Sequence, residues 1–337
     1  MEEKPTVIDL FCGAGGLSKG FEMAGCDVLL GIDHCKPCIE TFRRNHNAKG
    51  ILQDIRNVIG NDILGYIDNT KIDLIVGGPP CQGFSMAGNR DPKDPRNSLF
   101  KDFARLVGAL EPKWFVMENV TGILVSKTAG GSDVSEIIMQ EFKKIGYNVQ
   151  STVLTAADYG VPQKRKRVFF IGTNTGLPIK FPDPSHSEEA KMDVQGNILE
   201  KWIPVSDILL DEKTVESGYF HTQKMIDGFT NRKKRNKENG KGFGWQILKM
   251  DKPSYTISAR YWKDGADALV RYSPIKVRML TERECARIQS FPDDYVFAGN
   301  KRERYEQIGN AVPPLLAKAI ANSIKRSLKE TSSICHG

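Results

Sequence analysis

The most specific chemical signal in the sequence is a cysteine within a glycine- and proline-rich segment. The residues Gly77-Gly78-Pro79-Pro80-Cys81-Gln82-Gly83-Phe84-Ser85 follow a short apolar run, Ile72–Val76. Two prolines fix the backbone before Cys81, and open α/β sheets bind their ligands at the carboxyl ends of strands. Only about 3% of an ordinary thiol is thiolate at pH 7, so the surroundings must activate it. The segment predicts a nucleophilic cysteine, and a buried structural cysteine is the weaker alternative.

A second segment could hold a nucleotide-type ligand. Asp9-Leu10-Phe11-Cys12-Gly13-Ala14-Gly15-Gly16 joins an apolar run to a helical pattern, and its glycines allow a tight turn against a ligand. Ser18 stands where the dinucleotide fingerprint G-x-G-x-x-G needs its last glycine, which disfavours pyrophosphate. Asp33 ends the next apolar run and is placed to accept hydrogen bonds from a ribose diol. An adenosine-type cofactor is favoured over a turn that binds nothing.

A third candidate is the carboxylate in Glu118-Asn119-Val120, which follows the apolar run Trp114–Met117. A carboxyl group at the mouth of a parallel sheet can act as a general acid and contribute about 100- to 10,000-fold to a rate. Taken alone, a Glu-Asn pair is more often a helix cap or a loop anchor. Its weight therefore comes from the two segments described above.

Alternating patterns in the first 175 residues predict the elements that position these groups. Apolar runs typical of strands buried on both faces occupy Thr6–Phe11, Val28–Ile32, Ile72–Val76, Trp114–Met117 and Val168–Ile171. Helical spacing of apolar residues occupies Leu17–Ala24, Pro37–Asn45, Leu99–Leu110 and Val134–Ile145. Strands that alternate with helices predict a doubly wound α/β sheet.

The pattern loosens after about Phe181, and a second region begins there. Asn231–Gly244 concentrates basic residues and glycines, which favours a loop. Thr281–Gln289 begins with a capping-box pattern of Thr281 and Glu284, and its Cys285 is expected in a core. Pro314–Leu328 predicts a terminal amphipathic helix.

Length and composition bound the class of protein. The 337 residues suffice for about two domains, and 40% hydrophobic with 26% charged residues is typical of a soluble globular chain. No long apolar stretch exists and the first residues are acidic, so neither a membrane span nor a signal peptide is expected. The net charge of +7 divides into −2 for residues 1–150 and +9 for residues 151–337, which suggests a polyanion contact in the second part or an uninvolved basic surface.

The seven cysteines form no disulfide framework, so we expect reduced thiols. Cys35-Lys36-Pro37-Cys38 has the spacing of a redox or zinc motif. No second pair at ligand spacing accompanies it, so neither a redox nor a metal role is expected, and the segment is expected to open a helix instead.

Five motifs together resemble those of DNA (cytosine-5) methyltransferases of the prokaryotic restriction-modification type. They are Asp9–Gly16, the segment around Pro79-Pro80-Cys81-Gln82, Glu118-Asn119-Val120, Gln163-Lys164-Arg165-Lys166-Arg167 and Gln307-Ile308-Gly309-Asn310-Ala311-Val312. Order and spacing both agree from residue 6 to about 325. The resemblance implies a Rossmann-like S-adenosylmethionine-dependent methyltransferase domain, residues 1–180 plus 305–330. It also implies a smaller target-recognition domain, residues 181–304, before a tail, 331–337.

The resemblance assigns roles to individual residues. Cys81 would add to carbon 6 of a cytosine flipped out of duplex DNA, Glu118 would hold its ring nitrogen 3 and amino group, and two arginines would orient the base. The implied catalytic set is Cys81, Glu118, Arg165 and Arg167. The alternative for both arginines is phosphate binding or solvated strand ends.

The resemblance implies S-adenosylmethionine as cofactor, S-adenosylhomocysteine as product and no metal. The implied cofactor contacts are Phe11, Gly13, Ala14, Gly15, Gly16, Asp33, Asp54, Ile55, Pro80, Asn310 and Ala311. His34 stands where the family often has a large aromatic residue, so the family's adenine contact is not carried over to it.

Double-stranded DNA is the expected partner. The implied DNA contacts are Gln82, Ser85, Arg232, Lys233, Lys234, Arg235 and Thr256. The basic residues can neutralise phosphates without reading sequence. We expect a monomer without membrane contact in the cytoplasm, associated with the nucleoid. A cognate restriction endonuclease acting on the same site is a candidate partner, and an orphan enzyme is the alternative.

Two rival functions stay open. The tRNA-acting branch of the family more often has Pro-Phe-Thr where this chain has Gly83-Phe84-Ser85. A DNA-binding protein that kept the fold without activity is disfavoured because Cys81, Glu118, Arg165 and Arg167 are all present.

Overall fold

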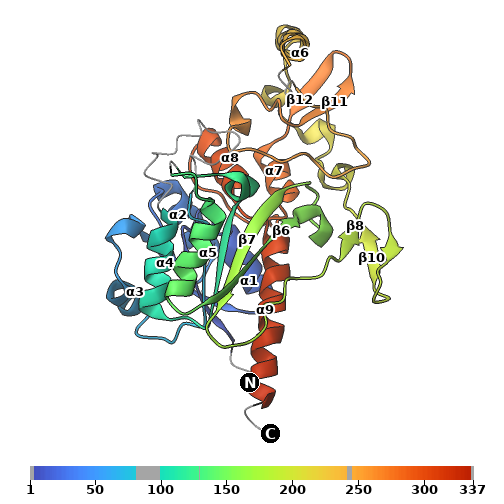
Figure 1. The fold of residues 1–337 in the computed structure, drawn as a ribbon. Coiled ribbons are helices and arrows are strands. Elements are labelled where there is room, and N and C mark those ends of the chain that lie inside the picture. Colours follow the sequence, from blue (N-terminus) through green and yellow to red (C-terminus); the bar gives the residue numbers. More distant parts are fainter. Residues whose placement is uncertain (1–3, 81–98, 129, 241–244, 335–337) are drawn as a thin grey trace. The chain divides into compact units, whose positions relative to one another are not determined.

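A computed structural model describes residues 4–80, 99–128, 130–240 and 245–334 (Figure 1). For residues 329–334 it describes the backbone only. The chain divides into two compact units. The first comprises Met1–Thr155, Lys166–Asp183 and Leu316–Gly337, and the second comprises Ala156–Arg165 and Pro184–Leu315. Residues 156–165 and 305–315, which the sequence placed in the catalytic domain, thus cluster with the second unit.

The first unit holds a seven-stranded sheet in the order β3-β2-β1-β4-β5-β7-β6. Its strands are β1 (Thr6–Leu10), β2 (Asp27–Asp33), β3 (Lys49–Leu52), β4 (Leu74–Gly77), β5 (Trp114–Val120), β6 (Asn148–Thr155) and β7 (Lys166–Thr173). Among these strands, β7 pairs antiparallel with both β5 and β6, and all other pairings are parallel. The predicted α/β class with a mainly parallel sheet is confirmed.

Helices cover both faces of this sheet (Figure 1). They are α1 (Gly16–Met23), α2 (Lys36–Asn45), α3 (Gly60–Tyr66), α4 (Leu99–Leu110), α5 (Val134–Lys144) and α9 (Pro314–Ile334). One apolar core joins α3, α4 and α5 to alternate strand residues such as Ile8 and Phe115. Residues alternate between the faces of a strand, so apolar runs without polar interruptions are buried on both sides.

The terminal helix α9 belongs to this first unit. Its buried residues, Leu316, Ala317, Ile320, Ala321 and Ile324, recur at helical spacing. The Ser323 hydroxyl donates a hydrogen bond to the Lys180 carbonyl oxygen at 2.7 Å, and the Lys325 ammonium donates one to the Ala24 carbonyl oxygen. The amphipathic helix predicted from the sequence is confirmed.

The second unit has its own core around residues such as Tyr261 and Phe291. Its elements include β8 (His186–Ser187), β9 (Lys191–Met192), β10 (Ile198–Lys201), α6 (Gln223–Glu238), β11 (Leu269–Ser273), β12 (Lys276–Met279), α7 (Glu282–Ile288) and α8 (Lys301–Asn310). The predicted capping box at α7 is confirmed, because Thr281 and Glu284 exchange side-chain-to-backbone hydrogen bonds. Cys285 is buried in the core, as expected.

The prediction of a loop over Asn231–Gly244 is wrong for residues 231–238, which are helical. Residues through Glu238 lie in α6, while 241–244 lie outside the described residues. Lys, Arg and Glu are good helix formers, and Thr222 caps the helix by accepting a hydrogen bond from the Met225 backbone N–H. Ile226 and Phe229, three residues apart, bury one side of the helix.

The cysteine prediction also needs correction, because Cys35 and Cys38 form a disulfide with their Cα atoms 5.2 Å apart. Cys35 is the N-cap of α2 and Cys38 lies in its first turn, so the helix itself brings the two sulfurs together. The predicted helix start is confirmed. Cys12, Cys26 and Cys285 are free and buried.

A buried ion pair organises the second unit. The Arg278 and Glu284 side chains are both 0% exposed, and two N–O contacts of 2.8 Å join guanidinium and carboxylate. Glu284 also accepts the Thr281 backbone N–H at 2.8 Å. The pair therefore connects β12 to the start of α7.

Replacing Arg278 by methionine is expected to lower the free energy of unfolding by about 3–5 kcal/mol, because an unpaired carboxylate stays buried. Urea denaturation followed by circular dichroism measures this loss. The control is Arg302→Met, which removes an exposed ion pair with Glu306 and should cost less than about 1 kcal/mol. Equal losses in the two variants would mean that Arg278–Glu284 is not the organising contact.

Within the described ranges, no helix is long and apolar enough to cross a membrane.

Candidate active site

The candidate groups gather at one edge of the sheet in the first unit. The parallel strands β1, β2 and β4 end at Leu10, Asp33 and Gly77. The turn that starts at Phe11, the carboxylate of Asp33 and the segment leading to Cys81 thus follow neighbouring strand ends. This is the edge at which open α/β sheets bind ligands.

The glycine turn after β1 is held open by unusual backbone angles. Phe11, Gly13 and Gly15 all have positive φ, of 60°, 53° and 84°. The Gly15 N–H donates to the Cys12 carbonyl oxygen at 2.8 Å, and α1 begins at Gly16. A Cβ at Gly13 would meet no atom within 4 Å, so the turn borders open space. The turn therefore leaves room for a ligand beside a helix start.

Asp33 is fixed against this turn. Its Oδ2 accepts the Gly13 backbone N–H at 2.9 Å and its Oδ1 accepts the Cys35 backbone N–H at 2.8 Å. A carboxylate offers about four acceptor positions, so two backbone bonds leave capacity for a diol. The residues present thus fit an adenosine-type cofactor, because a carboxylate with remaining acceptor positions lies beside the Gly13 turn. The exposed His34 lies 3.4 Å from the same carboxylate.

Asp54 and Ile55, both predicted cofactor residues, begin a short 3-10 turn, Ile55–Asn57. The Asp54 carboxylate caps this turn and pairs with Arg56, which holds the pKa of Asp54 down at about 2. Ile55 is buried. In this structure the Asp54 side chain therefore faces Arg56 and acts as a local cap.

Glu118 is paired with Arg167 across two strands. The β5–β7 register sets Val120 opposite Arg167, and the Arg167 Nε lies 2.8 Å from the Glu118 Oε1. The two side chains are only 15% and 11% exposed. Burial lowers the pKa of Arg167, while the neighbouring Glu118 opposes that shift. The arrangement supplies a nearly buried carboxylate with a fixed orientation.

The same strand end holds the segment before the predicted nucleophile. The Asn119 amide donates to the Pro79 carbonyl oxygen at 3.0 Å. A Cβ at Gly78 would lie 3.0 Å from the Glu118 Oε2, so only a small residue allows this approach. Cys81, Gln82 and Ser85 lie outside the described residues. Asn119, which the sequence reasoning did not assign, is thus a positioning residue for the backbone that leads to Cys81.

Arg165 belongs to the second unit, where it is 1% exposed. Its guanidinium donates to the carbonyl oxygens of Ile257 at 3.2 Å and Gly309 at 2.9 Å. A Cβ at Gly309 would press against the backbone of Ser258 and Ala259. The structure therefore brings together two of the five motifs, those that contain Arg165 and Gly309, and Arg165 connects both to the segment at Ile257.

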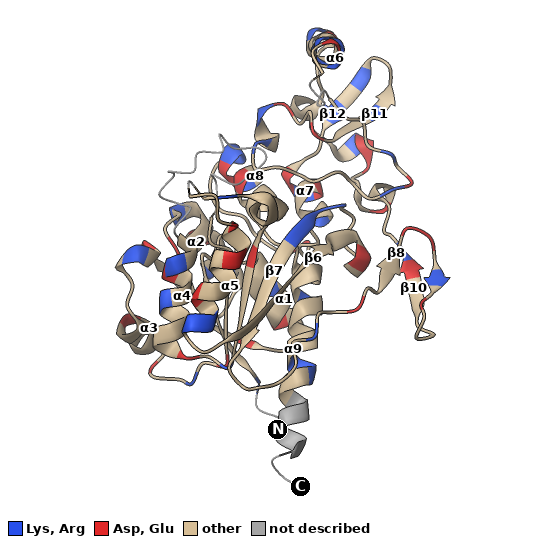
Figure 2. Ribbon diagram, in the orientation of Figure 1, with Lys and Arg blue, Asp and Glu red and all other residues tan. Residues whose placement is uncertain are grey.

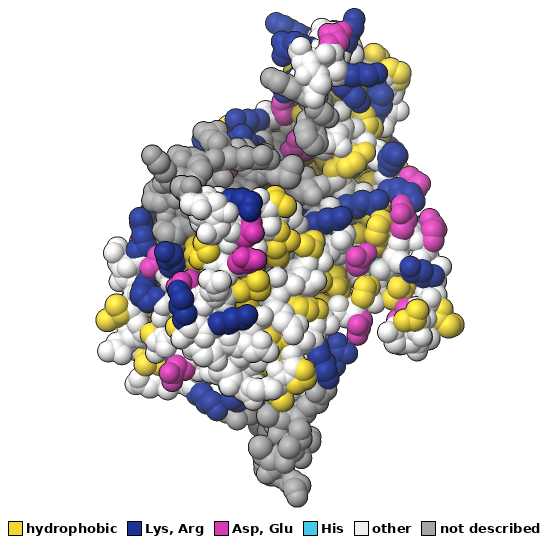
Figure 3. All heavy atoms as spheres, viewed as in Figure 1, with side chains coloured by type: hydrophobic (Ala, Val, Ile, Leu, Met, Phe, Trp, Pro, Cys, Tyr) yellow, Lys and Arg dark blue, Asp and Glu magenta, His cyan; other side chains and the backbone are white. Residues whose placement is uncertain are grey.

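The remaining predicted residues of the second unit lie on or near its surface. Asn310 ends α8 and is exposed, and Ala311 is its half-buried C-cap. Thr256 is exposed, and its hydroxyl contacts the Lys164 carbonyl oxygen at 3.4 Å. The basic residues Arg232, Lys233, Lys234, Arg235 and Lys237 lie on α6, where Figures 2 and 3 show a concentration of positive side chains. A helix presenting cations to solvent can neutralise phosphates.

Asp9 begins the motif Asp9–Gly16, but the sequence pattern predicted no role for it. It is 0% exposed at the end of β1, and its Oδ2 accepts the Ser18 hydroxyl at 2.6 Å. Burial raises the pKa of Asp9 to about 7. An acidic residue inside an otherwise apolar strand was the signal that could have drawn attention to it.

The raised pKa of Asp9 predicts a pH-dependent stability. The folded chain binds this proton more tightly than the unfolded one, so stability is greatest below about pH 4 for this group and falls as pH rises through about 7. The shift corresponds to at most about 4 kcal/mol. In Asp9→Asn, the difference in unfolding free energy between pH 5 and pH 8 should shrink relative to the wild type. An undiminished difference, as expected for the exposed control Asp251→Asn, would contradict this role.

A mainly parallel sheet with an antiparallel β7, a glycine turn after β1 and an acid ending β2 define a Rossmann-like α/β fold with a site for a nucleotide-type ligand. Residues 5–326 match the family described as C-5 cytosine-specific DNA methylase, and the chain belongs to this family. It is therefore a DNA (cytosine-5-)-methyltransferase.

Individual relatives cover most of the chain. It is 39% identical over 330 residues to the type II methyltransferase M1.HphI of Haemophilus parahaemolyticus, covering 95% of this chain and 86% of that protein. It is 38% identical over 373 residues to M.DdeI of Desulfomicrobium norvegicum, covering 94% and 88%. A DNA modification methyltransferase encoded within an E. coli prophage superposes with a TM-score of 0.72 at 26% identity, covering 97% and 100%.

Proposed function

We propose that this enzyme transfers the methyl group of S-adenosylmethionine to carbon 5 of a cytosine flipped out of a specific duplex DNA sequence, through a covalent adduct with Cys81. The observation that carries the proposal is the end of β5. There Glu118 is oriented by Arg167 at 2.8 Å, while Asn119 holds the Pro79 carbonyl oxygen just before the nucleophile.

The chemistry needs a nucleophile and a proton donor. Carbon 5 of cytosine is a poor nucleophile, so the Cys81 thiolate adds to carbon 6 and the Glu118 carboxyl supplies a proton at ring nitrogen 3. The resulting enamine accepts the methyl group at carbon 5. Transfer of the carbon-5 proton to water then allows β-elimination, which restores the ring double bond and releases the Cys81 thiolate, and the proton on ring nitrogen 3 returns to Glu118. Arg165 and Arg167 are proposed to orient the base and the active-site groups.

S-adenosylmethionine supplies an activated methyl group. The proposed pocket residues are Phe11, Gly13, Ala14, Gly15, Gly16, Asp33, Asp54, Ile55, Pro80, Asn310 and Ala311. Asp33 would accept hydrogen bonds from the ribose hydroxyls, and the backbone of the Gly13 turn would border the cofactor. S-adenosylhomocysteine is the product, and no metal takes part.

Replacing Asp33 by alanine is expected to weaken S-adenosylmethionine binding by about 10- to 100-fold, because charge-assisted hydrogen bonds to the ribose are lost. Duplex DNA affinity should stay nearly unchanged. Titration calorimetry with the cofactor and with DNA separates the two effects. Unaltered cofactor affinity would remove the ribose role of Asp33, and Asp27→Ala at the exposed start of β2 is the matched control.

Duplex DNA is the proposed substrate. Rotating a base out of the stack costs a few kcal/mol, which protein contacts must offset. Gln82, Ser85 and Thr256 are proposed to contact the DNA near the target, while Arg232, Lys233, Lys234 and Arg235 on α6 contact phosphates. The names of the curated relatives also support a cognate restriction endonuclease as partner. We propose a monomer that works in the cytoplasm on nucleoid DNA.

A methylation assay tests this function. Labelled S-adenosylmethionine is offered with duplex DNA or with tRNA, and the product is identified as 5-methylcytosine. Transfer to duplex DNA is expected, and its rate should fall steeply with added salt because phosphate contacts release counterions. Transfer to tRNA alone would overturn the proposal in favour of the tRNA-acting alternative, and binding of DNA without transfer would favour an inactive DNA-binding protein.

A further inference from the structure

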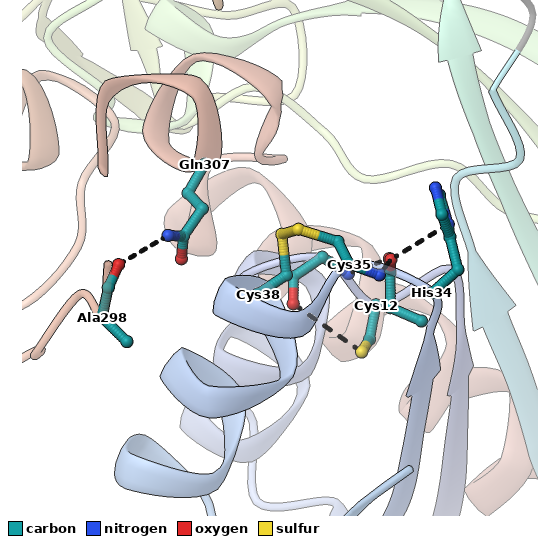
Figure 4. The surroundings of a disulfide bond; sticks show 8 residues. Cys12, His34, Cys35, Cys38, Ala298 and Gln307 are labelled. Carbon is teal, nitrogen blue, oxygen red and sulfur yellow. Dashed lines mark hydrogen bonds and ion pairs between the residues drawn. A yellow bond between two sulfur atoms is a disulfide. The ribbon is translucent and has the colours of Figure 1, made fainter. Parts of the chain in front are cut away.

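We propose that Cys35 and Cys38 form a reversible redox site whose disulfide fixes the first turn of α2 and thereby the position of Asp33. The consequence would be tighter cofactor binding in the oxidised enzyme than in the reduced one. This role presupposes that Asp33 binds the cofactor, as proposed above. Figure 4 shows the disulfide at the start of α2, beside His34.

The pair is open to reagents, unlike the free cysteines that the structure describes. Cys35 and Cys38 are half-buried, whereas Cys12, Cys26 and Cys285 are buried. Both sulfurs lie at the amino end of a ten-residue helix, where the aligned peptide dipoles favour a thiolate. A C-x-x-C pair at such a position can exchange with an external thiol.

The disulfide also replaces a helix cap. The Cys35 N-cap makes no side-chain hydrogen bond to the first turn, and that turn contains no acidic residue. Lys36 instead places a positive charge at the positive end of the helix. Because the first turn of α2 has no side-chain cap, the disulfide between Cys35 and Cys38 is the side-chain contact that stabilises this turn. Breaking it should let the turn fray.

One hydrogen bond from a backbone N–H couples the first turn of α2 to the Asp33 carboxylate. The Cys35 N–H donates to the Asp33 Oδ1 at 2.8 Å, while the Gly13 N–H donates to Oδ2 at 2.9 Å. Fraying of α2 would release Oδ1 and leave the carboxylate held on one side only. His34, with 72% of its side chain exposed, is too free to replace that restraint.

The exchange needs a dithiol reductant, and its balance is simple. One thiolate of the reductant attacks a sulfur of the pair, breaking the Cys35–Cys38 bond and forming a mixed disulfide. The second thiol of the reductant then displaces the enzyme's sulfur. Two electrons and two protons pass to Cys35 and Cys38, which become thiols, and the reductant ends as a disulfide.

The test uses the full chain in oxidised and dithiol-reduced form. Differential alkylation and mass spectrometry of the peptide that contains both cysteines reports their state, and calorimetry measures S-adenosylmethionine binding. A helix cap typically changes such a local equilibrium by about fivefold, so reduction is expected to weaken cofactor affinity by about that factor. DNA affinity should not change.

Two double variants separate capping from mere loss of the bond. Cys35→Ala/Cys38→Ala lacks both disulfide and cap, and should bind the cofactor like the reduced enzyme whatever the reductant. Cys35→Ser/Cys38→Ala restores a cap through the serine hydroxyl, and should bind like the oxidised enzyme. Equal cofactor affinity in all forms, or a pair that dithiols cannot reduce in the folded enzyme, would overturn the proposal.

The Asp33→Ala variant distinguishes this failure from failure of the proposed function. If Asp33→Ala weakens cofactor binding while reduction does not, the ribose role stands and the redox site does not. If Asp33→Ala leaves binding unaltered, the ribose role itself is wrong.

Discussion

The Glu118→Gln variant is expected to methylate duplex DNA about 100- to 10,000-fold more slowly than the wild type. The amide keeps the shape of the side chain and can still accept the Arg167 N–H that now lies 2.8 Å away. It cannot supply the proton that makes addition to cytosine feasible. Single-turnover rates with preformed enzyme–DNA–cofactor complexes measure the effect on chemistry alone.

An exposed glutamate elsewhere in the first unit provides the control for this test. Glu136→Gln changes an exposed carboxylate on α5 and should leave the rate unchanged. Cofactor and DNA affinities of Glu118→Gln should stay close to those of the wild type, because the loss falls on the reaction step. A rate within about threefold of the wild type would show that Glu118 is not the proton donor.

The Cys81→Ala variant is expected to lose methyl transfer to background. Duplex DNA carrying 5-fluorocytosine at the target should trap the wild-type enzyme in a denaturation-resistant adduct when S-adenosylmethionine is present, because fluorine blocks the final elimination. Gel electrophoresis under denaturing conditions detects the adduct.

The buried cysteines of the described chain serve as controls for that adduct. Cys285→Ala should still be trapped, since its thiol lies in the core of the second unit and burial raises the pKa of Cys285 well above its usual range. Trapping of Cys81→Ala would refute the nucleophile assignment.

The strands that carry the site could be predicted, because apolar runs such as Trp114–Met117 have few alternatives to a doubly buried strand. The antiparallel direction of β7 could not, since strand direction depends on pairing and leaves no mark in local composition. β6 escaped prediction as well. It lies at the sheet edge, and its buried residues, Val149 and Leu154, are separated by polar and partly exposed ones.

The candidate site shows the same division. Glu118 could be singled out from its motif, and Arg167 from another motif far along the chain. Their ion pair depends on the β5–β7 register, which sets Arg167 opposite Val120, and no local pattern specifies that register. α6 was missed because basic residues and glycines suggested a loop, whereas helix propensity and the buried Ile226 and Phe229 decided the outcome.

The first unit is assembled from three separate stretches of chain, and its last stretch is the helix α9. Loops closed over such long separations form slowly, and a ribosome delivers the chain from its amino end. During translation, the glycine turn and the Cys81 segment therefore emerge long before Leu316–Ile324 can cover the sheet. A nascent or prematurely terminated chain would lack that cover, so full methyltransferase activity should be confined to chains whose synthesis has passed α9.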